Sequence, residues 1–585
     1  MVSAKILPAF LSLFALASAQ LENNVIEYNV INLLNDTHTM GVIVDNVTYP
    51  LSFDSKVTNI LYNGKAPVAK NGYQYAKISK EDNSTEAEPF VRQPTHESTL
   101  NEFYNRTWNT QNVSQLPVVF EPLKAINRAQ SDLHREGEIP TIHLVANQTA
   151  IDLMHNSNST EDYKIDTNMT YITLNNTQSY EAAEISLAGR SSRWMTKLSY
   201  NIKLAKKDRI GEFRRVKLRA MDTDPSYIRE QLAYDVIKST GLLSSEFSFV
   251  RVFLNNQALG LFGIIETFHD PWLANSFAGG DKKYKNGNLY QGVFQNAQSS
   301  AMNRTSDLSY YNNITAYADG QYKIKVEASK GKSEDYTPLM EFTKFIDTAP
   351  TTSSDAVAAW NEKLDTDSFL RSMALEVIMG YSDGYFTMVD NYYLYQNLDT
   401  GKFFYISSDM DLTLGSCMFK LDDMWSGNYT TFPGLATRPL MKKILQVPEF
   451  KQQYEELLVN ITQKLVNPVV MNDRINGLVA MTKEDVAWDK TLPRVGKDVF
   501  GALGAAMSNS SDMSSMESSD IGNVIGDFPP NMDMEVLLDF GTRMSTNLTQ
   551  QDAVNGPTGY KSLSGVKEWI KNQSGAITKF YNSTS

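Results

Sequence analysis

Residues 376–415 constrain the fold more than any other stretch of this 585-residue chain. They read EVIMGYSDGYFTMVDNYYLYQNLDTGKFFYISSDMDLTLG. An apolar, helix-like run breaks at 382–384, and two strand-like runs, 391–395 and 402–406, follow on either side of an Asp/Gly turn. Two such runs around a short Asp/Gly turn are typical of a β-hairpin. The stretch therefore predicts a helix leading into a hairpin.

Polar oxygen-bearing side chains lie at the open end of this hairpin. Asp383 precedes it, Asn391 begins it, and Asp409 and Asp411 follow it. Alternate residues of a strand share a face, so extended backbone would place Asp409 and Asp411 side by side. Such a pair repels unless a cation lies between them or one stays protonated, and these are the hard ligands that Mg²⁺ prefers. Ordinary turn and strand-end residues of a buried hairpin would give the same sequence pattern, so a metal site and a purely structural role both remain possible interpretations.

The first residues have the pattern of a secretory signal. Residues 1–19 combine an early lysine, an apolar run and a small-residue cleavage site before Gln20. No later stretch approaches the roughly 18 apolar residues of a transmembrane helix, and the polar C-terminus lacks the tail of a GPI-anchor signal. We therefore expect a protein secreted to the extracellular space, or held on a spore or cell surface, with no transmembrane segment.

Composition supports this expectation. The chain has 17 Asn-x-Ser/Thr sites, which are acceptors for surface glycans in secreted proteins. Its one cysteine, Cys417, excludes an internal disulfide, so stability must come from hydrophobic cores. The net charge of −13 argues against nucleic acid as a partner.

The N-terminal part has the pattern of a small β domain. Within residues 20–95, short strand-like runs separated by Asn, Asp and Gly turns have the spacing of a β-sandwich. They are 25–31, 41–44, 57–62 and 73–78. Such a domain could bind a wall component or act as a cap.

Residues 180–270 predict strands with one crossing helix. The expected elements are strands 185–190, 197–204 and 216–219, a helix 224–241 with Asp224 as N-cap, and a hairpin 249–266. With the helical periodicity that begins at 339, this predicts an α+β fold. The β-rich unit also resembles the small lobe of a kinase, where a strand lysine binds phosphates and an acid fixes it. Lys197 and Lys217 are candidates for the lysine and Glu230 or Glu266 for the acid, although solvated strand residues are the alternative.

Residues 275–340 look like a less ordered insertion rich in Asn, Gly, Lys and Tyr. Lys282, Lys283, Lys285, Lys323 and Lys325 make it locally basic, so it could flank an acidic substrate or be a solvated loop face. Helical patterns then cover 339–346, 357–364, 369–378, 440–445, 450–465, 469–480, 482–488 and 566–580.

Four motifs together resemble the spore-coat CotH family, especially its secreted or surface members in Mucorales-type fungi. They are RVKLRAMDTDPSYIREQLAYDVIKSTG, FVRVFLNNQALGLFGIIE, SDGYFTMVDNYYLYQNLDTGKFFYISSDMDLTLG and VAWDKTL. The resemblance implies an atypical, two-lobed protein-kinase-like fold that binds ATP with Mg²⁺ or Mn²⁺. The sequence departs from bacterial members at Ser408, where they tend to have Trp, and at Asp390, where many have His.

The resemblance also implies residue roles. Asp383 matches the catalytic aspartate, and Asp409 matches the metal-binding aspartate with Asp411 and Asn391 beside it. The resemblance implies cofactor-binding roles for Lys197, Glu266 and Asn391. Arg190, in a loop that could cover the phosphates, and Lys217, on its strand, are further candidates for cofactor binding.

The expected organisation is a signal peptide, a β domain and a CotH kinase-like domain. The ranges are 1–19, 20–95 and 96–585, the last with a β-rich lobe at about 130–335, a helical lobe at about 336–585 and a disordered loop at about 505–525. The expected function is transfer of the ATP γ-phosphate to Ser or Thr of secreted or coat proteins. The alternative is a non-catalytic, invasin-like adhesin that binds host-cell surface or wall proteins.

Overall fold

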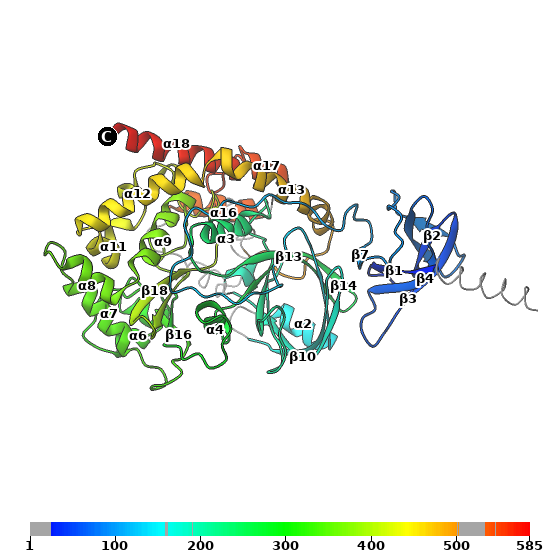
Figure 1. Cartoon of the computed structure of the whole chain (residues 1–585), viewed down its shortest axis with the longest axis horizontal. Coiled ribbons are helices and arrows are strands. Elements are labelled where there is room, and N and C mark those ends of the chain that lie inside the picture. The colour runs from blue at the N-terminus through cyan, green and yellow to red at the C-terminus, as the bar shows by residue number, and fades with distance from the viewer. Residues whose placement is uncertain are drawn as a thin grey trace, which may run out of the picture.

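A computed structural model describes residues 25–157, 162–189, 191–499, 501, 533–544 and 546–584. The predicted signal at 1–19, Arg190 and the predicted loop at 505–525 lie outside the described residues. Sheets dominate the first half of the chain and helices the second half (Figure 1), which confirms the α+β class. Within the described part, no helix is both long and apolar enough to span a membrane.

The N-terminal strands form one seven-stranded sheet in the order β6-β5-β2-β3-β4-β1-β7. Their bounds are β1 Val25–Ile31, β2 His38–Val44, β3 Val47–Phe53, β4 Leu61–Pro67, β5 Tyr73–Ser79, β6 Thr85–Ala87 and β7 Glu102–Phe103. The sheet curls until β5 faces β1: the Tyr73 and Tyr28 rings lie 5.0 Å apart, and the Tyr75 hydroxyl donates to the Asn29 carbonyl. The N-terminal unit is therefore one continuous sheet curled around its own core, and not the predicted sandwich of two stacked sheets.

Seven further strands close into a barrel in the order β10-β11-β12-β14-β13-β8-β9. Their bounds are β8 Thr141–Ala146, β9 Ile165–Ile172, β10 Thr177–Leu187, β11 Tyr200–Lys203, β12 Arg215–Arg219, β13 Phe247–Leu254 and β14 Gln257–Glu266; helix α2 is Gln148–Asn156. Tyr200, Leu218 and Ile264 are paired across neighbouring strands and fully buried, as alternation requires for residues filling a barrel. The predicted hairpin at 249–266 is confirmed as β13 and β14.

The crossing helix α3, Arg229–Ser239, begins later than predicted. The Asp224 carboxylate accepts hydrogen bonds from the Ser226 amide and hydroxyl and from the Arg229 amide and side chain. A side chain bonded to its own downstream backbone stabilises a turn. Asp224 therefore stabilises the turn before the helix and accepts from the amide of its first residue, Arg229, although the N-cap position itself is Ile228.

A third sheet has the order β16-β15-β17-β18. Its strands are β15 Leu289–Gly292, β16 Tyr322–Val326, β17 Tyr392–Asn397 and β18 Lys402–Ser407, with helices α4 Trp272–Phe277, α5 Ala297–Ala301 and α6 Thr315–Ala318 between or before them. The hairpin predicted from 376–415 is confirmed. The interpretation of 275–340 as a less ordered insertion was wrong, because β15 and β16 extend the sheet from the free edge of β17.

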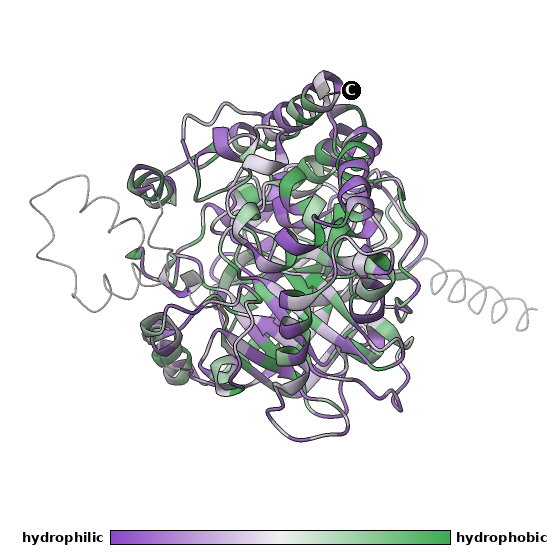
Figure 2. Cartoon of the chain, turned by 90° about the vertical axis from the view of Figure 1, so that its left-hand side faces the viewer, coloured by the Kyte–Doolittle hydropathy of each residue, from purple (hydrophilic) through white to green (hydrophobic). Residues whose placement is uncertain are grey.

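Helices make up most of the chain between β16 and β17 and after β18. Their bounds are α7 Thr337–Thr348, α8 Ala356–Lys363, α9 Thr366–Met379, α10 Leu421–Met424, α11 Pro439–Ile444, α12 Pro448–Lys464, α13 Pro468–Asp489, α16 Met534–Met544, α17 Gln550–Asn555 and α18 Val566–Thr584. Helix α9 packs against β18, α12 and α18, and twelve of its fourteen residues are buried. Figure 2 shows the resulting concentration of hydrophobic segments in the interior.

A buried ion cluster joins the barrel, helix α13 and the segment that follows β7. The Asp485 carboxylate on α13 accepts from Arg251 of β13 at 2.7 and 2.8 Å and from Arg106 at 2.9 Å. Asp485 is fully buried, and the charges of Arg251 and Arg106 outweigh the effect of burial and lower its pKa. Two sequence-distant arginines therefore depend on one carboxylate.

We expect Asp485→Ala to lower the free energy of unfolding by about 3–5 kcal/mol, because it leaves two buried guanidinium groups without their shared partner. Glu184→Ala, which breaks a partly exposed pair with Lys203, is the control and should cost less than about 1 kcal/mol. Urea unfolding of both variants measures the difference, and equal costs would contradict the assignment.

Candidate functional site

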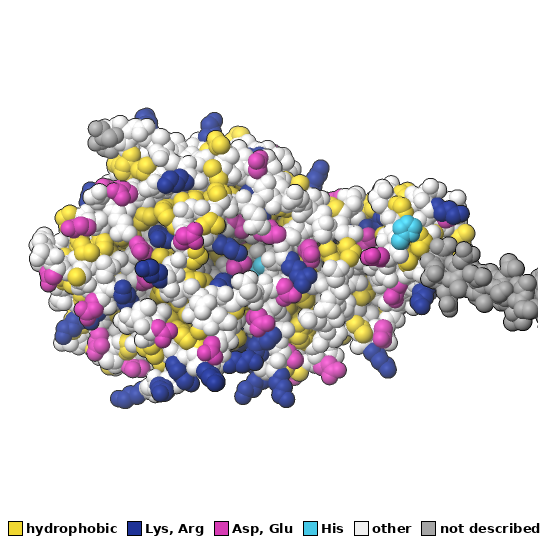
Figure 3. Space-filling view, in the orientation of Figure 1, with side chains coloured by type: hydrophobic (Ala, Val, Ile, Leu, Met, Phe, Trp, Pro, Cys, Tyr) yellow, Lys and Arg dark blue, Asp and Glu magenta, His cyan; other side chains and the backbone are white. Residues whose placement is uncertain are grey.

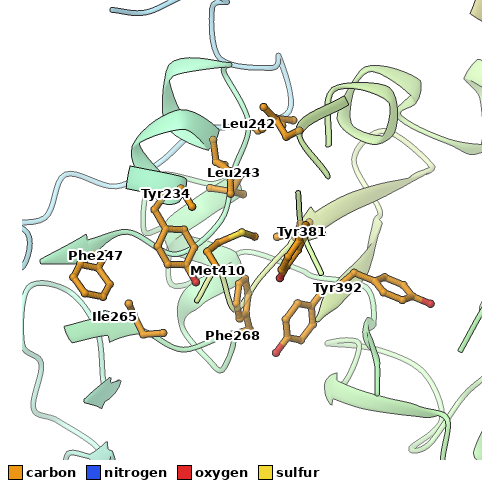
Figure 4. Packing of buried hydrophobic residues seen from close by; sticks show 14 of the residues in the cluster. Tyr234, Leu242, Leu243, Phe247, Ile265, Phe268, Tyr381, Tyr392 and Met410 are labelled. Carbon is orange, nitrogen blue, oxygen red and sulfur yellow. The ribbon is translucent and has the colours of Figure 1, made fainter. Parts of the chain in front are cut away.

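The candidate site lies where the loops after α9 and β18 meet the outer side of barrel strand β12. Asp383 follows α9, and Asp409 and Asp411 follow β18. Between the two carboxylates, Met410 is fully buried. In Figure 4 it lies near Tyr234 of α3 and Tyr381, so buried packing anchors the loop that carries both acids.

Arg219, the last residue of β12, is the centre of the site. Its Nη2 lies 2.5 Å from Asp409 Oδ1 and 3.3 Å from Asp411 Oδ2, and its Nε lies 2.9 Å from Glu230 Oε2 on α3. The Arg219 side chain is 8% exposed. One buried guanidinium thus links the barrel, the crossing helix and the loop after β18.

Lys217, two residues earlier on the same side of β12, is the second cation. Its ammonium lies 3.5 Å from Asp409 Oδ2. Burial alone would raise the pKa of Asp409, but the charges of Arg219 and Lys217 outweigh it and lower this pKa to about 2. Asp409 is therefore ionised at any physiological pH, and its side chain is still 31% exposed.

Asp383 has the opposite electrostatics. Its Oδ2 accepts from Asn391 Nδ2 at 2.8 Å, while its Oδ1 is buried without a hydrogen-bond partner among the described residues. Burial first, and then the charges of Asp411, Asp409 and Asp390, raise its pKa well above the ordinary value. The site therefore holds an ionised carboxylate next to one that is poised to take a proton.

Backbone geometry at the site differs from the extended conformation that the sequence suggested. Asp409 has φ = 59°, Asn391 has φ = 55° and Val389 has φ = 51°. Positive φ is costly for such residues, most of all for β-branched valine. Asp409 and Asp411 do not meet by alternation along a strand, because β18 has ended at Ser407; both reach the same guanidinium instead.

Glu376 of α9 holds the Asp383 loop in place. Its carboxylate accepts from the Tyr385 and Phe386 amides, each at 2.9 Å, and from the Tyr405 hydroxyl at 3.3 Å. The loop presses so closely on this carboxylate that a Cβ at Gly384 would lie 2.9 Å from Glu376 Cδ. Glycine is therefore required next to Asp383 by close approach.

Two predicted site residues are engaged elsewhere. The Lys197 ammonium is buried and lies 2.7 Å from Asp489 Oδ1 of α13 and 2.5 Å from the Leu261 carbonyl. Glu266 is fully buried and pairs with Arg128 and with His134 at 2.9 Å. Lys217, not Lys197, contacts Asp409, and Glu230, not Glu266, is the acid that joins this cation network.

Sequence reasoning missed Arg219 and Thr223. The Thr223 hydroxyl donates to Asp411 Oδ2 at 2.9 Å, so it fixes the second carboxylate. The available signal was the alternation of basic residues Arg215, Lys217 and Arg219 along one short strand, which places all three on one side of it.

The donor set fits a divalent cation bound together with phosphates. No three His, Cys, Asp or Glu side chains of the described residues are arranged to hold a metal by themselves. Mg²⁺ needs no such cage, because it usually keeps waters and binds one or two carboxylates with substrate phosphates. Asp409 and Asp411 could supply those carboxylate ligands, with Asn391 as a carboxamide neighbour, which leaves the unpartnered Oδ1 of Asp383 free beside them.

We expect Glu376→Gln to destabilise the protein by about 1–3 kcal/mol, because one buried backbone amide then faces an NH₂ group instead of an acceptor. Glu341→Gln, an exposed change on α7, is the control and should be within about 0.5 kcal/mol of wild type. Thermal unfolding compares them; an unchanged Tm for Glu376→Gln would show that the loop does not depend on this carboxylate.

Comparison with known proteins places this site within a family. The family model described as CotH kinase protein matches residues 185–492, which include Lys197, Lys217, Asp383 and Asp409.

Among curated relatives, Invasin CotH2 of Rhizopus delemar is 26% identical over 407 residues, 68% of this chain and 65% of the relative. Spore coat protein homolog 1 of the same fungus is 25% identical over 425 residues, 71% of this chain and 66% of the relative. Inner spore coat protein H of Bacillus subtilis is 26% identical over 306 residues, 52% of this chain and 78% of the relative. The chain thus spans about two thirds of the length of these fungal relatives. Since the family model covers more than half of the sequence, the chain belongs to the CotH kinase protein family.

Proposed function

We propose that this protein is a secreted, ATP-dependent phosphotransferase that modifies Ser or Thr hydroxyls of secreted or coat proteins, with Mg²⁺ or Mn²⁺ as cofactor. The observation that carries the proposal is the pairing of Arg219 on β12 with Glu230 on α3 and with Asp409. In protein kinases a strand cation, a helix glutamate and a metal-binding aspartate must be in place together. The barrel with α3 would form one lobe, and the third sheet with its helices the other.

Asp383 would act on the acceptor hydroxyl. Its Oδ1 has no partner among the described residues, and Asn391 orients the carboxylate through Oδ2. The acceptor oxygen forms a bond to the γ-phosphorus while the bond from the γ-phosphorus to the β,γ-bridging oxygen breaks. The hydroxyl proton passes to Asp383, and ADP leaves. The raised pKa of Asp383 favours acceptance of this proton.

The cations would act on the nucleotide. Lys217 neutralises phosphate charge, while Arg219 holds Asp409 ionised and fixes its position against α3. A divalent ion bound at Asp409 and Asp411 would supply further charge neutralisation on the phosphate oxygens. Phosphoryl transfer depends chiefly on positioning and electrostatics, which this network provides.

We expect ATP with Mg²⁺ or Mn²⁺ to raise the Tm of the wild type, and Asp409→Ala to abolish this increase. Asp383→Asn should keep the increase but lower transfer of labelled phosphate to a Ser-rich peptide by about 100-fold or more, because it loses the proton acceptor. Asp399→Asn, at the far turn of the same hairpin, is the matched control and should behave as wild type. No Tm increase with either metal would argue against nucleotide binding.

The second candidate function is adhesion to host-cell or wall proteins. It is favoured by the similarity to Invasin CotH2 of Rhizopus delemar and by the N-terminal sheet, which stands to one side of the remaining chain in Figure 1. An adhesin would use its surface and would not need proton transfer at Asp383.

We therefore expect Asp383→Asn, which is inactive in transfer under the first proposal, to bind cultured host cells as well as the wild type if adhesion is a surface property. Flow cytometry with labelled protein measures the binding. Equal loss of adhesion and of transfer in this variant would tie both to one site, whereas the absence of wild-type binding would remove the adhesin candidate.

A further inference from the structure

An open groove of about 510 Å³ lies between helices α12 and α18, which pack against each other. Its lining consists of side-chain amides, hydroxyls, two lysines and one glycine, and none of these residues is acidic. The chain as a whole carries 67 acidic against 54 basic residues, so this lack of acids is local. Neither helix carries a residue of the candidate site described above, so the groove is a separate feature of the surface.

The two lysines of the groove are Lys571 and Lys579, both exposed on α18. Neither forms an ion pair with any residue that the structure describes. They lie eight residues apart, which is about 12 Å along a helix and roughly two turns, so both can face the same groove. The one acid of α18, Glu568, instead accepts from the Gly565 amide at 3.0 Å. In Figure 3, Lys and Arg side chains project from the upper edge, over the helices labelled α12 and α18 in Figure 1.

Thr462 of α12 gives the groove a buried hydrogen-bonding group that is not in use. The residue is only 2% exposed, and its hydroxyl has no hydrogen-bond partner among the described residues. A buried hydroxyl without a partner is unfavourable and calls for an explanation. Because Thr462 lines the groove, a ligand there could accept its hydrogen bond. The side-chain amides of Gln463 and Asn582, which also line the groove, form no hydrogen bond with described residues either.

The lining indicates the class of ligand. It contains no aromatic or large aliphatic side chain, whereas the energetic centre of a protein–protein interface is usually a buried aromatic or arginine anchor. Single-stranded nucleic acid would need aromatic side chains on which its bases could stack. Hydroxyl and amide groups beside unpaired lysines suit a ligand that is rich in oxygen and negatively charged.

We propose that the groove between α12 and α18 binds an acidic polysaccharide. Its sulfate or carboxylate groups contact Lys571 and Lys579, and one of its oxygens accepts from the Thr462 hydroxyl. An extended polymer that repeats its charges can reach two lysines that lie two helical turns apart. The inference goes beyond phosphate transfer and does not depend on Asp383, and it gives a surface-exposed protein a chemically defined ligand.

The first test is calorimetry at low ionic strength with two polymers, an oligogalacturonate that carries only carboxylates and a dextran sulfate that carries only sulfates. We expect at least one to bind the wild type, and the tighter of the two identifies the preferred group. The double variant Lys571→Met and Lys579→Met should lower this affinity about 10-fold or more, because it removes both charge-assisted contacts. Lys567→Met is the matched control on the same helix and should bind as wild type, since Lys567 pairs with Asn476 outside the groove.

The second test isolates the buried hydroxyl. Thr462→Val keeps the shape of the side chain, and we expect it to lower the affinity about 3-fold or more. Its Tm should equal or exceed that of the wild type, because the unpartnered hydroxyl is gone; loss of binding then does not reflect unfolding. The substitution also removes the glycan acceptor sequence at Asn460, so Asn460→Gln is the control and should bind as wild type.

The proposal is overturned if neither polymer binds, or if the double lysine variant binds as tightly as the wild type. It is also overturned if polyglutamate binds as tightly as the better polymer, in favour of an acidic protein partner. Asn582 begins a glycan acceptor sequence as well. Binding that is seen only in Asn582→Gln would show that the protein's own glycan covers the groove, which again overturns the proposal. Asp383→Asn should bind as wild type, so a failure of phosphate transfer leaves this inference standing.

Discussion

The Arg219 guanidinium is the contact on which the arrangement of the site depends. It is nearly buried, and a buried cation is tolerated only when acceptors surround it. Glu230, Asp409 and Asp411 supply them from two different parts of the chain. The dependence is mutual, because these carboxylates would repel one another without the guanidinium. A displacement of α3 would therefore move Glu230, and through Arg219 it would change the position of Asp409. The crossing helix and the site are coupled by this contact.

The carboxylates on the two sides of the Arg219 contact have pKa values shifted in opposite directions. On one side Asp383 is buried among other acids, and its pKa is raised; on the other, the charges of Arg219 and Lys217 lower the pKa of Asp409. Neighbouring carboxylates whose pKa values are shifted in opposite directions are typical of functional sites.

Local patterns predicted the elements well but not their partners. The hairpin of 376–415 and the loop residues Asp383 and Asn391 follow from turn chemistry and alternation, which act over a few residues. Turn chemistry and alternation could not decide between Lys197 and Lys217. Lys197 precedes a strand and Lys217 lies in one, so the two look alike in sequence. Closure of the barrel decides it: Lys197 meets Asp489, 292 residues later, whereas Lys217 faces the loop after β18. For the same reason the two strands within 275–340 could not be recognised, since β15 pairs with β17 far along the chain and β16 pairs with β15.

Asp409 has a left-handed backbone conformation and not the extended one that the sequence predicted, so its position must be maintained by other contacts. A left-handed aspartate is unfavourable locally, so something outside the loop must hold it. The Tyr381 hydroxyl donates to the Asp409 carbonyl at 2.8 Å, and the Ser382 amide donates to the Leu412 carbonyl at 3.0 Å. These bonds tie the Asp409 loop to the loop of Asp383, which Glu376 fixes to α9. Strain at one carboxylate is thus offset by packing around the other, and the two aspartates are positioned as a single unit.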